Sequence, residues 1–207
     1  ETTRPMPGSS ATDTNVVSLK KNDTVLLEVP FDDDVVQAPE NRKLLSVENI
    51  VKFADEVKIG DVQEVLQRQI DYNMAIAQAG MDGSYGATIG KILLKSYGNC
   101  IQNRAKAWAA AGSDARMCGC ELPVVINSGS GNQGITASVP VIVYATELGV
   151  DEDTMYRAMA LSDLTTIHQK TPIGRLSAYC GAVSAGAGSG AGIAYLSGAP
   201  MMRWSTP

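Results

Sequence analysis

The feature that most restricts the fold of this chain is a long uncharged stretch near its C-terminal end. No Asp, Glu, Lys or Arg occurs between Arg175 and Arg203, and this stretch contains the run YCGAVSAGAGSGAGIAYL. This stretch is long enough to form a membrane-spanning helix. However, Ala, Gly and Ser dominate it, whereas a membrane-spanning helix is rich in Leu, Ile and Phe. Each Gly in a helix interior costs about 1 kcal/mol relative to Ala. Very close helix packing would offset that cost, so we predict a closely packed, buried helix from Ile173 to about Leu196.

The rest of the chain predicts an α+β fold, with a small N-terminal part that contains a β-hairpin and a mainly α-helical domain after it. Residues 14–30 hold two β-branched runs on either side of KKND, which is typical of a hairpin. Apolar periodicity and caps predict helices at Ser46–Gly60, Asp61–Gly80, 89–98, 100–112, Ile135–Leu148 and Asp151–Lys170. We divide the chain into a β-rich segment with a charged loop (1–45, part of a domain), a helical domain (46–198) and an irregular tail (199–207).

The charge balance limits the partners. The net charge is −5 and the pI about 4.9, and no basic stripe with interleaved aromatic residues occurs. We therefore expect neither nucleic acid nor a membrane as a partner. The N-terminal residues lack a charged-then-apolar signal pattern, and four cysteines in a chain of this length imply no disulfide framework. We expect a cytoplasmic protein.

The segment INSGSGNQGI, residues 126–135, gathers small polar residues between two apolar runs. It is either a tight turn or a cradle for a small polar ligand. A glycine-rich turn that leads into a helix N-terminus exposes N–H groups and partial positive charge, which suits a carboxylate or phosphate. The spacing matches no nucleotide-binding motif. The apolar PVVI run before it favours a small-molecule pocket, and the hydrogen-bonding side chains are Asn127, Ser128, Ser130, Asn132 and Gln133.

Cysteine and histidine residues offer the remaining chemistry. Cys180 stands at the start of the Gly- and Ala-rich run, where a thiolate can ligate a metal, although a small buried residue is the alternative. Cys100, Cys118 and Cys120 are either buried thiols or ligands, and the spacing of CGC is too tight for an ordinary zinc site. His168 is the only histidine, so any Ser/His or Cys/His catalysis would need it.

Three blocks together carry a family resemblance. The blocks are GSDARMCGCELPVVINSGSGNQGI, LSDLTTIHQKTPIGRLSAYCG and AGAGSGAGIAYL. They resemble the L-cysteine desulfidase family, which is related to the serine dehydratase α-chain. The similarity runs from about Asn15 to Gly198, and the N-terminal hairpin segment resembles the β-rich segment that precedes the helical part of those proteins.

The resemblance implies a [4Fe–4S] enzyme that eliminates the β-substituent of a small amino acid, converting L-cysteine to pyruvate, ammonia and sulfide. It leaves cysteine and serine open as substrates and assigns no catalytic base. It implies that Cys180 ligates the cluster. The substrate-binding residues that it implies are Ser128, Gly129, Ser130, Gly131, Asn132, Gln133 and Arg175.

Two cysteine-bearing segments of that family have no counterpart in this sequence, one resembling GCTEP and one resembling CDGAK…SCA. We therefore expect a truncated member, with cluster binding and activity impaired. The first alternative is a cluster-free, inactive protein that binds a small amino acid or assembles with a partner. The second is a cluster-free enzyme that uses His168 and a cysteine thiolate. Beyond the substrate, the partners to expect are further copies of the chain or missing chain segments.

Overall fold

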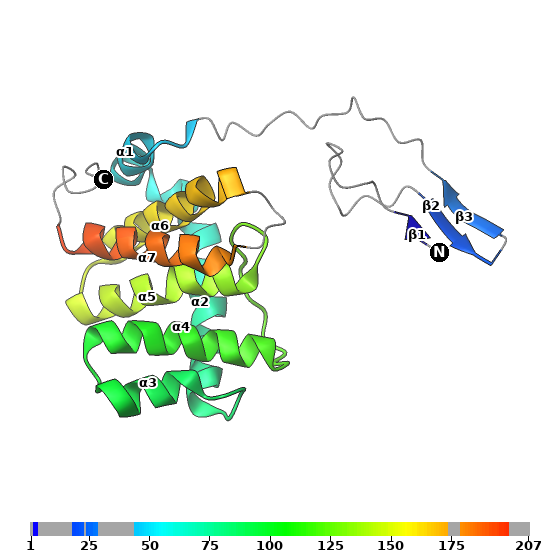
Figure 1. Ribbon diagram of the computed structural model, residues 1–207. Coiled ribbons are helices and arrows are strands. Elements are labelled where there is room, and N and C mark those ends of the chain that lie inside the picture. The colour runs from blue at the N-terminus through cyan, green and yellow to red at the C-terminus, as the bar shows by residue number, and fades with distance from the viewer. Residues whose placement is uncertain (1, 4–17, 23, 29–43, 174–178, 199–207) are drawn as a thin grey trace. The chain divides into compact units, whose positions relative to one another are not determined.

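The computed structural model describes residues 2–3, 18–22, 24–28, 44–173 and 179–198 (Figure 1). The chain divides into two compact units, residues 1–42 and residues 43–207, within which most contacts between Cα atoms fall. Each unit is described by itself. The predicted α+β class is confirmed, since a small antiparallel sheet precedes a helical unit.

The N-terminal unit contains the predicted hairpin. Strands β2 (Ser18–Lys21) and β3 (Thr24–Glu28) pair antiparallel, with Lys21 opposite Thr24, and β1 (Thr2–Thr3) pairs with β2. Asn22 follows β2 with φ at +53°, a conformation that Asn tolerates in tight turns. Every residue of β3 is exposed.

The helical unit stacks its helices in layers. Figure 1 shows α3, α4, α5 and α7 one above another, with α2 passing behind the stack. Residue contacts agree, because α4 packs on α2, α3 and α5, and α7 packs on α5 and α6. The helices are α1 (Val47–Glu56), α2 (Ile59–Asp82), α3 (Ile89–Tyr97), α4 (Ile101–Met117), α5 (Gly131–Leu148), α6 (Glu152–Ile173) and α7 (Gly181–Leu196).

Each predicted helix is present, but several bounds differ. Ser46 caps α1 as predicted, because its Oγ accepts a hydrogen bond from the N–H of Asn49 at 3.2 Å. Gly60 does not end this helix. The C-cap of helix α1 is Val57, whose extended backbone conformation does not require a glycine. Gly60 lies in the first turn of α2 instead. The prediction that α7 starts at Ile173 is wrong, since α6 continues to that residue.

Helix α7 is closely packed on one face, as its composition predicts. A Cβ added to Gly188 would lie 2.5 Å from the carbonyl oxygen of Ser162, and one added to Gly192 would lie 2.8 Å from that of Ala158. The prediction of a buried helix holds for one face only, because Val183 is 76% exposed and Gly186 and Gly190 are exposed too. No helix among the described residues is long and apolar enough to cross a membrane.

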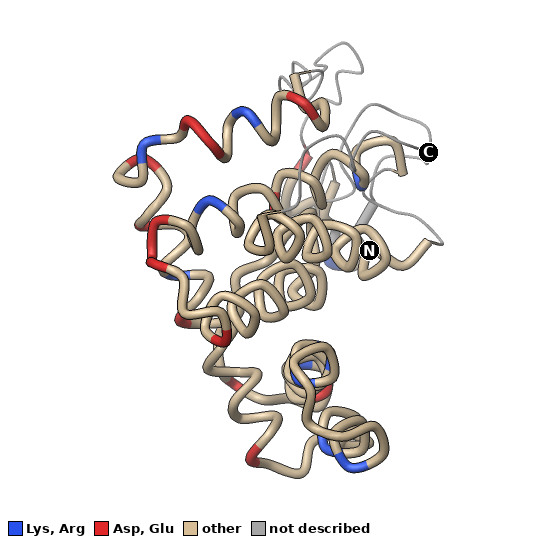
Figure 2. The backbone as a smooth tube through the Cα atoms, turned by 90° about the vertical axis from the view of Figure 1, so that its left-hand side faces the viewer, with Lys and Arg blue, Asp and Glu red and all other residues tan. Residues whose placement is uncertain are grey.

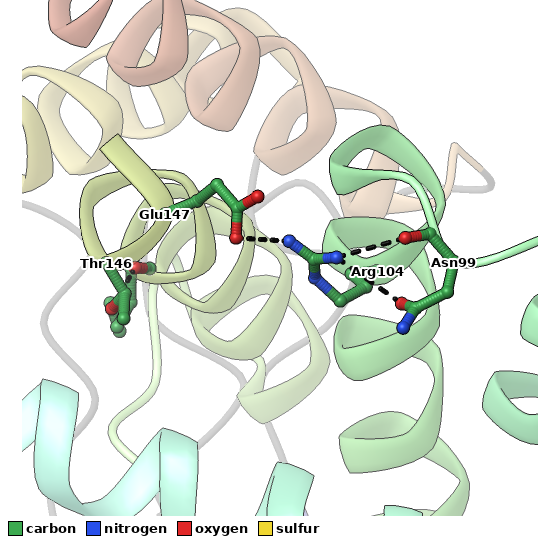
Figure 3. Close-up of polar contacts among 5 residues, drawn as sticks. Asn99, Arg104, Thr146 and Glu147 are labelled. Atoms are coloured by element: carbon green, nitrogen blue, oxygen red, sulfur yellow. Dashed lines mark hydrogen bonds and ion pairs between the residues drawn. The ribbon is translucent and has the colours of Figure 1, made fainter. Parts of the chain in front are cut away.

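Charged residues are scarce in two helices of this unit. Figure 2 shows long runs of helix without charged residues; α7 contains none, and Glu147 is the one charged residue in α5. It forms an ion pair with Arg104 of α4, whose guanidinium also donates to the carbonyl oxygen of Asn99 at 3.0 Å (Figure 3). This contact ties the C-terminal end of α5 to α4.

Candidate functional site

The glycine-rich segment is both a turn and the start of a helix. Helix α5 begins at Gly131, four residues before the predicted Ile135. Asn127 and Ser130 exchange two backbone N–H···O hydrogen bonds, both 3.2 Å long. Ser128 and Gly129 between them have φ of +49° and +88°. Two left-handed residues inside a two-residue turn are typical of type I′, whose twist favours a tight reversal.

Asn73 of α2 fixes the strand-like segment before this turn. Its Oδ1 accepts a hydrogen bond from the N–H of Val125 at 2.9 Å, and its Nδ2 donates to the carbonyl oxygen of Val125 at 3.2 Å. The same Nδ2 donates to the Oγ of Ser138 in α5 at 2.9 Å. Asn73 is fully buried, so these bonds satisfy polar groups that water does not reach. The turn is thereby attached to both α2 and α5.

The N-terminus of α5 lies beside a cation. Ser130 is the N-cap but makes no side-chain cap hydrogen bond, which leaves the first-turn N–H groups of the helix to water or a ligand. The Arg116 guanidinium occupies the space where a Cβ of Gly131 would be, and it donates to Oδ1 of Asn132 at 3.1 Å. The helix dipole and the guanidinium both favour an anion here.

Gln133 joins this helix start to that of α7. A Cβ on Gly181, the first residue of α7, would overlap the carboxamide of Gln133, so the two residues are in direct contact. Gln133 is only 6% exposed, and its Oε1 accepts no hydrogen bond from any described residue. Cys180 is the N-cap of α7 and is exposed. The structure therefore places the glycine-rich segment against Gly181, the residue that follows Cys180.

One other implied residue, Ser128, lies elsewhere. Ser128 lines a cavity that includes no residue of α5 or α7. Arg175 lies outside the described residues, so Arg116 is the cation that the described part places at this site. Sequence reasoning did not single out Arg116, although it stands in the quoted block GSDAR.

The cavity has a volume of about 380 Å³ and lies between α1, α2, α6 and the segment before the turn. Its polar centre is Asp163 of α6, whose Oδ1 accepts hydrogen bonds from Nε2 of Gln69 at 3.1 Å and from Nδ2 of Asn127 at 2.9 Å. Burial raises the pKa of Asp163 to about 6, against the opposing effect of these two bonds. Sequence reasoning missed Asp163, although Ala160, Leu164 and Ile167 mark its face of the helix as apolar.

The other cysteines are not gathered into a metal site. No group of three His, Cys, Asp or Glu side chains within the described ranges is placed to hold a metal ion. Cys120 contacts Tyr85, and its thiol raises the pKa of that phenol. Among the hydrogen bonds of the described part, none joins His168 to a cysteine.

Comparisons with known proteins place the chain in one family. The sequence profile of the serine dehydratase alpha chain matches residues 12–205. A UPF0597 protein of Desulfitobacterium hafniense is 60% identical over 185 residues, which cover 89% of this chain and 43% of that protein. A UPF0597 protein of Lachnoclostridium phytofermentans is 50% identical, with 90% and 45% covered. The chain thus spans less than half the length of these relatives. No solved structure matches it.

Proposed function

We propose, from the premise that this chain belongs to the serine dehydratase alpha chain family, that it carries the amino-acid-binding part of a lyase. The reaction is β-elimination from a small amino acid. With L-cysteine, the Cα proton and the sulfur substituent are lost, and the aminoacrylate that forms takes up water to give pyruvate and ammonia. The sulfur leaves as sulfide.

The observation that carries this proposal is the contact between Gln133 and Gly181, beside Cys180. It joins two helix N-termini, and both of these favour negative charge. The substrate carboxylate binds the first-turn N–H groups of α5 and the guanidinium of Arg116. The Oε1 of Gln133, an acceptor without a donor among the described residues, accepts a hydrogen bond from the substrate ammonium.

A [4Fe–4S] cluster fits this site only in part. Cys180 offers an exposed thiol at a helix N-cap, but no group of three metal-ligating side chains among the described residues includes it. The other ligands would have to come from outside the described residues. When bound, a cluster supplies a Lewis-acidic iron for the leaving group. The residues described here bind and orient the amino acid.

The test is anaerobic reconstitution of the chain with iron and sulfide, followed by assays of bound iron, acid-labile sulfide, and pyruvate released from L-cysteine and L-serine. Cys180→Ala is compared with Cys100→Ala, because Cys100 is also an exposed thiol at a helix N-cap. We expect the parent and Cys100→Ala to bind iron and Cys180→Ala to lose it. Iron retained by Cys180→Ala would overturn the role of Cys180.

A parent chain that binds no iron and releases no pyruvate would overturn cluster-dependent elimination by this chain. In that case, stabilisation by L-cysteine in a thermal melt would favour the second candidate, a cluster-free protein that binds a small amino acid. The absence of a third metal-ligating side chain near Cys180, within the described ranges, is the observation in favour of this candidate.

A further inference from the structure

The cavity around Asp163 is a second site that the proposed lyase function does not use. Two helical stripes form its walls, Val62, Val65, Leu66 and Gln69 from α2 and Ala160, Asp163, Leu164 and Ile167 from α6. The stripes follow helical spacing, so each helix turns one continuous face to the cavity. A volume of about 380 Å³ lies within the range of small-molecule sites, roughly 300–1,000 Å³.

The cavity stays open to solvent at an apolar rim. Phe53, Val65 and Ile126 line it and are 43%, 54% and 60% exposed. Apolar walls around a few polar groups are typical of a site that holds the hydrocarbon part of a ligand and orients it by one polar contact. Here Asp163, with Gln69 and Asn127, forms that polar group.

The charged residues that line the cavity favour a ligand of positive charge. Among the described residues that line it, Asp61 and Asp163 are the ionisable ones, and none is Lys, Arg or His. Both hydrogen bonds to Asp163 end on Oδ1, so its Oδ2 retains capacity for a further donor. A carboxylate in apolar surroundings gains most from a cation that replaces its lost hydration.

We propose that this cavity binds a small organic cation, a protonated amine with a hydrocarbon body whose ammonium group contacts Asp163. The body lies between the apolar stripes of α2 and α6. A zwitterionic amino acid is a poor fit, because its carboxylate would find two aspartates and no cation. The cavity therefore differs in specificity from the proposed substrate site, where Arg116 and a helix N-terminus favour an anion. Because Asn127 holds Asp163 and begins the turn before α5, a bound amine also contacts the segment that leads to that site.

The experiment measures binding of three related probes to the full chain by titration calorimetry at neutral pH. The probes are 2-phenylethylamine, its neutral analogue 2-phenylethanol and the zwitterion L-phenylalanine. We expect the amine to bind at least ten-fold more tightly than the other two, and excess L-cysteine to leave its affinity unchanged. Equal binding of the amine and the alcohol would overturn the proposal.

Asp163→Asn is the decisive variant, because an asparagine Oδ1 can still accept the hydrogen bonds from Gln69 and Asn127. We expect it to weaken amine binding at least ten-fold. The matched control is Asp61→Asn at the exposed start of α2, where we expect a change of less than about three-fold. Unchanged binding by a folded Asp163→Asn variant would refute the site.

Amine binding to the unaltered chain, measured at several pH values, tests the role of Asp163 even if Asp163→Asn does not fold. The amine stays protonated between about pH 5 and pH 8. Asp61 and Asp163 are the titratable groups that line the cavity, and Asp163 has a pKa of about 6. We expect amine affinity to fall roughly ten-fold from pH 7 to pH 5 as Asp163 is protonated. A pH-independent affinity over that range would overturn the proposal.

Discussion

Replacing Gly188 by Ala tests the close packing of α7 on α6. The added Cβ would lie 2.5 Å from the carbonyl oxygen of Ser162 and would overlap Oγ1 of Thr166. That hydroxyl donates to the same carbonyl at 2.8 Å, so it cannot turn away without losing its hydrogen bond. Gly190 on the same helix is exposed and has nothing within 4 Å of an added Cβ. Gly190→Ala is therefore a matched control.

The two substitutions should change the free energy of unfolding in opposite directions. Overpacking a close helix contact costs about 1–3 kcal/mol, and the lost hydrogen bond about 1 kcal/mol. Ala recovers about 1 kcal/mol through its higher helix propensity. We expect Gly188→Ala to lower the free energy of unfolding by about 1–3 kcal/mol, and Gly190→Ala to raise it by about 0.5–1 kcal/mol.

Thermal and urea unfolding, followed by circular dichroism, measures both variants. For a chain of this size, 1 kcal/mol corresponds to about 2–4 °C in Tm. Gly188→Ala should therefore melt about 2–12 °C lower than the parent, and Gly190→Ala a few degrees higher. If both variants were equally stable, or if Gly190→Ala were the more damaging, the packing of α7 deduced here would be wrong.

Three further predictions concern the two sites. Asn73→Ala should lower the free energy of unfolding by about 2–5 kcal/mol in urea denaturation, because the buried Ser138 hydroxyl and the backbone of Val125 lose their partner. Arg116→Gln should raise the KM for the amino acid roughly ten-fold, while Arg104→Gln, at the other end of α5, should leave it unchanged; equal effects would contradict a role in carboxylate binding. Burial raises the pKa of Asp163 to about 6, above about 3.9 in the unfolded chain. The folded state then holds a proton that the unfolded state has released. Stability should fall by up to about 3 kcal/mol from pH 4 to pH 7, and Asp163→Asn should remove that slope.

The helices were predictable where local signals agree with the packing. Ser46 has a cap partner three residues on, and Gly149 adopts a left-handed conformation at the end of α5, as a glycine stop signal predicts. The start of α5 was missed because Gly131 and Gly134 suggest a loop. These helical positions are glycines because larger side chains would overlap Arg116 and the carbonyl oxygen of Val125. Such contacts join segments that are distant along the chain, and periodicity does not encode them.

The candidate site was likewise predictable only in part from the sequence. The sequence pointed to Gln133 and Cys180 separately, through polar density and family resemblance. Their proximity depends on Gly181, which admits the Gln133 carboxamide against the start of α7. Asp163 was missed because a single carboxylate on a helix is most often solvated. Its environment comes from α2 and from the turn, through Gln69 and Asn127, and both are remote in sequence.

The glycine-rich segment therefore serves two surfaces at once. Its first half, with Asn127 and Ser128, lines the cavity around a carboxylate, and its second half, with Asn132 and Gln133, faces Arg116 and the start of α7. One surface favours a cation and the other favours an anion. The type I′ turn between them is held by Asn73 through Val125. A displacement of this turn would alter both surfaces together, so Asn73→Ala should weaken amine binding and amino-acid binding in the same preparation. An effect on only one of them would show that the turn does not support both sites.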